Sequence, residues 1–227
     1  MQFFELKIKS AILLCILFSG FKGFAQLPQF SLATDFTIVR SFQKHQRYWT
    51  VGQTVAGNFH ITARDAVYTL LAYTGNGKFT NQLEAPAKDA QTSPQHISFT
   101  NRASLKFMHI SIGWKHYFVG DALSETGWNL YGQAGFGLMM GKVVNLQSAS
   151  IDTLVYDNPV LPGKANFKRL TLDLALGYEL PVGGGVAFYM EGRALVPTTD
   201  YPSKYLWVNN DAPFTGSVNL GIRLLFE

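Results

Sequence analysis

Apolar and polar residues alternate with a period of two along the C-terminal half of the chain. In the segment 128–140 the even-numbered positions are apolar or small, and the odd-numbered positions are small or more polar. The same alternation recurs over 169–180, 186–196 and 217–226, where leucine, valine and aromatic residues share one parity. Because successive side chains of a strand point to opposite faces, this pattern predicts four β-strands with one apolar face each.

Four further strands are expected in the N-terminal half, where the alternation is less regular. They cover 30–42, 49–61, 66–74 and 102–118. In the last of these, Leu105 and Phe107 break the parity set by the other apolar residues. That break predicts either a β-bulge or apolar side chains that fill an interior. Most of the eight strands reach the length of about 9 to 11 residues that a tilted strand needs to cross a bilayer.

The connections between these strands alternate in length after the first one, 43–48, which is short. The short ones are 62–65, 119–126 and 181–185, and the long ones are 75–101, 142–168 and 198–213. Short turns on one side and long loops on the other are typical of outer-membrane barrels, and lipid requires a sheet without edges. The sequence therefore predicts an all-β fold, an eight-stranded antiparallel transmembrane up-and-down β-barrel with both termini on the periplasmic side.

The first 25 residues have the features of a signal peptide. Lys7 and Lys9 precede an apolar run at 11–18, and small residues occupy the −3 and −1 positions of a cleavage site after Ala25. An uncleaved N-terminal anchor is the alternative, but the run is short for a stable span. We therefore expect a signal peptide over 1–25 and the barrel domain over 26–227.

Composition narrows the class of protein further. Charged residues make up only 15% of the chain, against roughly 25% in soluble domains, while aromatic residues reach 14%. Loss of the leader removes Lys7, Lys9 and Lys22 together with Glu5, which lowers the formal charge from +4 to about +2. No basic stripe remains that would favour nucleic acid. The single cysteine, Cys15, lies in the leader, so the mature chain has no disulfide and no thiol catalyst.

The polar parity of the strands is expected to face the barrel interior and to gather charge there. The residues of this predicted lumen network are Asp173, Glu179, Glu191, Arg193 and Arg223, with Lys106 as a further candidate. Buried charges are costly unless they are paired, and an eight-stranded interior is just wide enough for side chains to fill. We expect a mutually satisfied polar core that plugs the barrel; a gated or proton-linked path through it is the alternative.

Aromatic residues of the outward parity cluster near the expected periplasmic ends of the strands. They are Trp114, Phe118, Trp128, Tyr178, Phe188 and Phe226. Aromatic side chains of this kind line the interface between lipid and water, so these residues are predicted to form a membrane girdle.

The leader, the eight alternating strands and the end of the chain together resemble the outer-membrane β-barrel families of the OmpA/OmpX type. The final strand is similar to the signal that the barrel-assembly machinery reads in such families, with Asn219, Gly221, Leu224 and Phe226 at the matching positions; Glu227 departs from it, because the aromatic residue usually ends the chain. The leader ending at Ala25 resembles those of Bacteroidetes. The resemblance implies the outer membrane of a Gram-negative bacterium, with outer-membrane lipid and the assembly machinery as partners, and it specifies no activity.

Candidate chemistry is sparse. His109 and Ser111 share a parity, and with a lumen acid they could form the nucleophile, histidine and acid of a lipid-modifying enzyme. A hydrogen-bonded interior histidine is the simpler interpretation. The sequence shows no phosphate loop and no metal-ligand spacing, so we expect no enzyme activity and no cofactor.

The leading functional hypothesis is a structural or surface-interaction role through the loops at 75–101 and 142–168, which could meet an extracellular ligand or surface partner. A small pore or transport accessory is the second hypothesis, and a lipid-modifying enzyme is the third.

Overall fold

The computed structural model describes residues 29–42, 46–198 and 214–226. The expected signal peptide and its cleavage position, most of the connection 198–213 and Glu227 lie outside the described residues. Nine strands are present in the described part: β1 (Gln29–Ser41), β2 (Trp49–His60), β3 (Asp65–Thr74), β4 (Gly77–Pro86), β5 (His96–Val119), β6 (Asn129–Gln147), β7 (Gly163–Gly183), β8 (Val186–Pro197) and β9 (Thr215–Phe226). The same residues contain no helix that is both long and apolar enough to cross a membrane.

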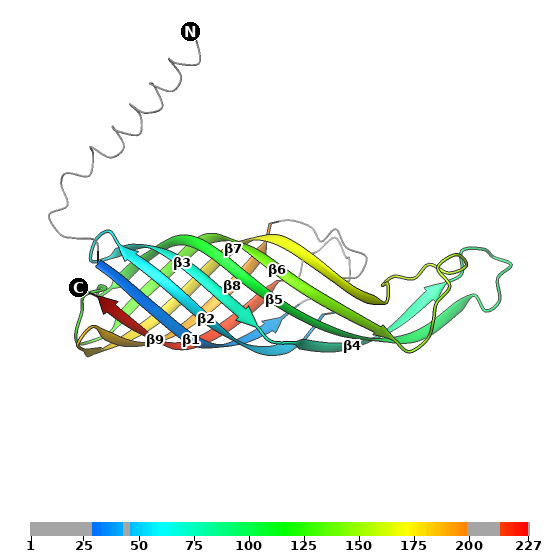
Figure 1. Ribbon diagram of the computed structural model, residues 1–227, viewed down its shortest axis with the longest axis horizontal. Helices are drawn as coiled ribbons and strands as arrows, with labels where there is room; N and C mark the ends of the chain where they lie inside the picture. Colours follow the sequence, from blue (N-terminus) through cyan, green and yellow to red (C-terminus); the bar gives the residue numbers. More distant parts are fainter. Residues whose placement is uncertain (1–28, 43–45, 199–213, 227) are drawn as a thin grey trace, which may run out of the picture.

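The strands form one closed antiparallel barrel. Neighbours pair in the order β3-β2-β1-β9-β8-β7-β6-β5-β4, and β3 also pairs with β5. Because β3 and β4 pair with successive parts of β5, they share one place in the ring, which gives eight positions. Figure 1 shows the strands tilted across the barrel. The predicted eight-stranded antiparallel fold is confirmed.

The two ends of the barrel differ in the length of their connections. One end, called here the turn end, carries the connections between β2 and β3, between β5 and β6, and between β7 and β8, and the C-terminus lies there (Figure 1). At Gly183, Gly184 and Gly185 the tight turn between β7 and β8 needs positive φ angles, which glycine adopts without strain. The opposite end is called the loop end.

The long connections are shorter than the sequence predicts, because much of 75–101 and 142–168 is strand. β4 occupies 77–86, β5 begins at His96, β6 continues to Gln147 and β7 begins at Gly163. Together with the connections 87–95 and 148–162, these strand ends form an extension that projects past the barrel (Figure 1). The strand ends stay regular because they and the connections bury an apolar cluster of their own. This cluster is made by Ala85, Phe99, Ile151 and Tyr156.

The interior of the barrel is filled by side chains from every strand. Toward the loop end lies an apolar layer: Val39, Tyr48, Phe79, Ala103, Leu105, Phe107, Met139, Val143, Val160, Phe167 and Leu195. Leu105 and Phe107 therefore point inward and fill the lumen, and β5 pairs with β6 in unbroken register at both positions. Of the two explanations for the broken parity, apolar filling is confirmed and a bulge at this point is wrong.

Candidate functional site

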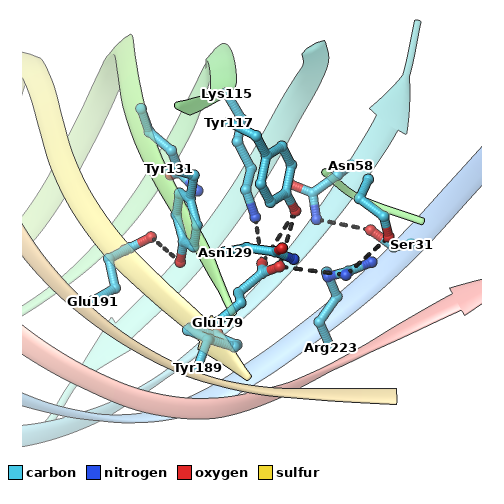
Figure 2. Close-up of polar contacts among 12 residues, drawn as sticks. Ser31, Asn58, Lys115, Tyr117, Asn129, Tyr131, Glu179, Tyr189, Glu191 and Arg223 are labelled. Carbon is cyan, nitrogen blue, oxygen red and sulfur yellow. Dashed lines mark hydrogen bonds and ion pairs between the residues drawn. The ribbon is translucent and has the colours of Figure 1, made fainter. Parts of the chain in front are cut away.

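The interior toward the turn end is a charged layer centred on Glu179. Lys115 Nζ lies 2.7 Å from Glu179 Oε1, and Arg223 Nη2 lies 3.3 Å from Oε2. The hydroxyl of Tyr117 donates to the same carboxylate at 3.1–3.2 Å. All four side chains are buried, and Figure 2 shows them converging from β5, β7 and β9. One carboxylate is thus shared by two cations, which is the condition under which buried charge is tolerated.

A second ion pair joins Glu191 and Arg193 of β8. Arg193 Nη2 lies 2.8 Å from Glu191 Oε1 and also donates to Gln133 Oε1 at 2.7 Å. The hydroxyl of Tyr131 donates to Glu191 Oε2 at 3.0 Å, and Asn219 Nδ2 donates to Oε1 at 3.2 Å. Both oxygens of the carboxylate therefore have partners, which fixes side chains of two further strands, β6 and β9, around it.

The last predicted lumen acid, Asp173, belongs to a third group in the middle of the barrel. It accepts a hydrogen bond from Thr171 Oγ1 at 2.9 Å, and His109 Nε2 lies 3.4 Å from the same Oδ1 atom. His109 Nε2 is also 2.9 Å from Thr171 Oγ1. A lumen acid absent from the predicted set, Asp35, accepts hydrogen bonds from Tyr189 at 2.7 Å and Thr37 at 2.6 Å.

The structure places all five predicted lumen residues inside the barrel. They form three separate groups rather than the single network that the sequence predicts. Glu179 meets Arg223 and Glu191 meets Arg193, while Asp173 meets His109. Lys106 is a wrong prediction: it is exposed on the outer wall. It lies between Leu105 and Phe107, and once these face inward the pleat forces Lys106 outward.

Sequence reasoning missed Lys115, the closest cation to Glu179. A usable signal was present in the sequence, because Lys115 lies on the parity opposite to the apolar series Met108, Ile110, Ile112 and Trp114. Its partner could not be read from the sequence, because the contact joins β5 to β7 across the lumen.

The connection between β5 and β6 closes the turn end of the lumen. Ala122 is buried, and its carbonyl accepts a hydrogen bond from Arg223 Nη2 at 3.1 Å. Asn129 Nδ2 donates to the carbonyl of Asp121 at 2.8 Å, and the Ala122 amide donates to the carbonyl of Ala63 at 2.8 Å. The charged layer thus holds this connection across the barrel end.

The extension at the loop end is held by contacts between its two connections. The Tyr156 hydroxyl donates to the carbonyl of Pro94 at 3.1 Å, and Lys88 Nζ donates to the carbonyl of Thr153 at 2.5 Å. Two large apolar side chains of the extension nevertheless face outward, Leu146 at 67% exposure and Leu154 at 86%. A folded platform with exposed apolar side chains is suited to contacts with another molecule.

The remaining predicted residues lie on the outer wall or in β9. Trp114, Trp128, Tyr178 and Phe188 are exposed, as are Phe118 and Phe226, and the rings of Trp128 and Tyr178 stack at 5.9 Å. In β9, Asn219 faces the lumen, Leu224 and Phe226 face outward, and Gly221 lies opposite Asp35. Their roles as a girdle and as an assembly signal stay predictions.

The two residues of the enzyme hypothesis lie inside the barrel. His109 and Ser111 are both buried inside the barrel, and the polar partners of His109 Nε2 are Thr171 and Asp173 rather than the serine. Within the described ranges no cluster of three or more His, Cys, Asp or Glu side chains could hold a metal ion.

Comparison with known proteins supports the fold alone. No protein-family model matches the chain, and no curated protein gives a significant sequence match. Among solved structures, Neisserial surface protein A is similar at a TM-score of 0.53 and 12% identity, over 87% of this chain and 97% of that one. The chain has the fold of a small outer-membrane β-barrel.

Two further structures with this outer-membrane barrel fold are similar at lower scores. Ail of Yersinia pestis, solved with the heparin analogue sucrose octasulfate, has a TM-score of 0.49 at 11% identity, over 88% of this chain and all of Ail. A major outer-membrane protein of Thermus thermophilus has a TM-score of 0.49 at 10% identity, over 87% of this chain and 99% of that one. The resemblance to small outer-membrane barrels is confirmed, and the Bacteroidetes-like character of the leader stays a prediction.

Proposed function

We propose that this protein is an integral outer-membrane barrel of a Gram-negative bacterium, with a closed lumen, and that it acts at the cell surface through its extension. The observation that carries the proposal is the contrast between a filled interior and a folded projection. Between the charged and apolar layers lies a cavity of about 20 Å³, room for roughly one water molecule. The extension, in contrast, has its own apolar cluster and presents Leu146 and Leu154 outward.

Insertion in lipid follows from the outer wall. Large apolar side chains are exposed on every strand of the ring, including Phe36, Val55, Ile112, Phe136, Leu176, Met190 and Leu220. A soluble protein rarely exposes such a continuous apolar band, whereas the outward face of a membrane barrel carries one about 25 Å tall. By the rule that periplasmic turns are short, the extension lies outside the cell and the turn end faces the periplasm.

The orientation can be tested with single cysteines, because the only native cysteine, Cys15, lies in the expected leader. We expect Ser150→Cys, in the extension, to react with a membrane-impermeant maleimide on intact cells. Ser124→Cys, in the connection between β5 and β6, is the matched control and should react only after the outer membrane is permeabilised. Labelling of Ser124→Cys on intact cells, with Ser150→Cys protected, would contradict the proposed orientation.

The surface role predicts an apolar contact at the extension. Retention of intact cells on octyl-substituted agarose should fall when Leu154 is replaced by Asp, because a charge opposes burial of this side chain. Glu84→Gln, also exposed on the extension, is the control and should leave retention unchanged. Equal retention of wild type and Leu154→Asp, with equal amounts of folded barrel at the surface, would contradict an apolar contact there.

We propose no enzyme activity and no cofactor for this barrel. This part of the proposal is supported by the burial of His109 and Ser111 and by their lack of a mutual hydrogen bond. His109→Ala should therefore leave the composition of the outer-membrane lipids unchanged, which mass spectrometry of extracted lipids can check. A change in lipid acylation that depends on His109 would favour a lipid-modifying enzyme instead.

A further inference from the structure

A groove of about 590 Å³ lies on the outer wall where β3, β5, β6 and β7 leave the apolar band. Its floor is apolar: Tyr73, Met108 and Met140 lie side by side in the sheet register. Next to this floor, Lys106 of β5 lies directly opposite Lys142 of β6. Lys168 of β7 lies opposite Met140 of β6. The groove thus combines three lysines with an apolar base.

The three lysines mark the same boundary on three adjacent strands. Proceeding from the turn end, the outward positions are largely apolar or small from Phe118 to Met108 in β5, from Leu130 to Met140 in β6 and from Leu180 to Leu170 in β7. Each stretch has the length of about 9 to 11 residues with which a tilted strand crosses the hydrocarbon core.

The next outward residue on each of these strands is one of the three lysines. The lysines therefore lie where acyl chains end and headgroups begin.

These charges have no acidic partner in the described part of the chain. The ion pairs found there involve other side chains, and the outward neighbours of Lys142 in the sheet are Lys106 and Asn166. Like charges directly opposite each other on antiparallel strands are destabilising. An anion held between them would remove that repulsion.

We propose that this groove binds a lipid of the outer leaflet whose headgroup carries phosphate. The lysine ammonium groups supply donors for phosphate oxygens, and the floor of Tyr73, Met108 and Met140 continues into the apolar band, where acyl chains lie. A free phosphate ion would use the lysines but gain nothing from that floor. The inference rests on the proposed insertion in a membrane and adds a specific lipid site to it.

The experiment uses the refolded mature chain in a zwitterionic detergent, with folding verified first by heat-modifiable gel mobility. Native mass spectrometry then measures retention of dilauroyl phosphatidic acid, of dilauroylglycerol, which lacks the phosphate, and of inorganic phosphate. The test variant is Lys106→Gln, Lys142→Gln and Lys168→Gln combined. The control variant removes the same charge from the extension, through Lys78→Gln, Lys88→Gln and Arg102→Gln combined.

We expect the wild type and the control to retain phosphatidic acid to within about twofold. The groove variant should bind it at least roughly tenfold more weakly, since basic residues near the headgroup attract anionic lipids. Dilauroylglycerol should not be retained, and inorganic phosphate should not displace the lipid. The site is overturned if the groove variant binds like the wild type or if the control weakens equally. It is also overturned if phosphate alone displaces the lipid. A wild-type chain that does not fold in detergent would instead contradict the membrane barrel itself, and this site with it.

Discussion

The two layers of the lumen fill the same barrel in different ways. The charged layer near the turn end uses Glu179 to join strands that lie on different sides of the ring, and it depends on specific geometry. The apolar layer near the loop end fills space with side chains such as Leu105 and Phe107 and depends on volume. Polar side chains therefore hold the turn end closed, while the loop end is sealed by packing that also supports the extension.

The largest loss of stability is expected at the centre of the charged layer. Glu179→Gln keeps the size of the side chain but leaves Lys115 and Arg223 buried without their carboxylate. Loss of one partner of a buried ion pair costs about 4 kcal/mol, so the free energy of unfolding should fall by that amount. Urea unfolding from phospholipid vesicles, followed by tryptophan fluorescence, measures it. Glu84→Gln on the extension is the control. If Glu179→Gln lowers the free energy of unfolding no more than this control does, the charged layer does not stabilise the barrel as described.

The apolar layer should respond through volume rather than charge. Leu105→Ala leaves a cavity among tightly packed side chains, so we expect a loss of about 3 kcal/mol in the same unfolding assay. Leu174→Ala is the matched control on the lipid-facing wall, where acyl chains can fill the space and the loss should be smaller. Equal losses at the two positions would mean that the apolar layer is not closely packed.

Gly221 of β9 lies between Asp35 of β1 and Tyr189 of β8, where the three strands approach closely. A methyl group added at Gly221 would lie against the Thr34 carbonyl and 2.6 Å from Asp35 Cβ, whereas at Gly192 nothing lies within 4 Å. Gly221→Ala should therefore cost about 2 kcal/mol through overpacking, and Gly192→Ala close to nothing. Refolding into vesicles without the assembly machinery measures this cost. If Gly221→Ala refolds like the wild type there but is inserted poorly in cells, the residue acts as an assembly signal rather than through packing.

The smallest expected effect is on the outer wall beside the charged layer. Trp128 and Tyr178 stack at the turn end, where the predicted girdle would meet the headgroups. A double-mutant cycle with alanine at the two positions should give a coupling energy of about 1 kcal/mol in the unfolding assay. A coupling near zero would show that the two rings act independently of each other.

Much of the barrel could be predicted because its strands have a period-two pattern of unusual regularity. The leucine series from Leu170 to Leu180 specifies both the strand and its lipid-facing side. The strands of the extension are harder to predict from the sequence, because they carry polar residues on the solvent side and so resemble loops. The prediction for Lys106 is wrong because charged residues of a barrel strand are expected to face the lumen. Only the inward positions of Leu105 and Phe107 show that Lys106 must face outward.

The sequence predicts which residues of the candidate site face the lumen, but not which of them contact each other. Parity alone placed Glu179 and Arg223 on the polar face of their strands. Their contacts, including the one with Lys115, depend on the register and closure of the whole ring, which join residues far apart in the sequence. The proximity of the three groove lysines likewise depends on the register between β5, β6 and β7, which the sequence does not specify.

Whether the lumen is closed can be measured as the conductance of the refolded mature protein in planar bilayers. Insertion is verified beforehand by heat-modifiable gel mobility, so that an absence of conductance reflects a closed lumen and not a lack of inserted protein. We expect no discrete conductance steps from inserted barrels, because the apolar layer and the connection at Ala122 obstruct the path at both ends. Reproducible ion-conducting steps from the wild type would contradict a closed lumen and favour a small pore.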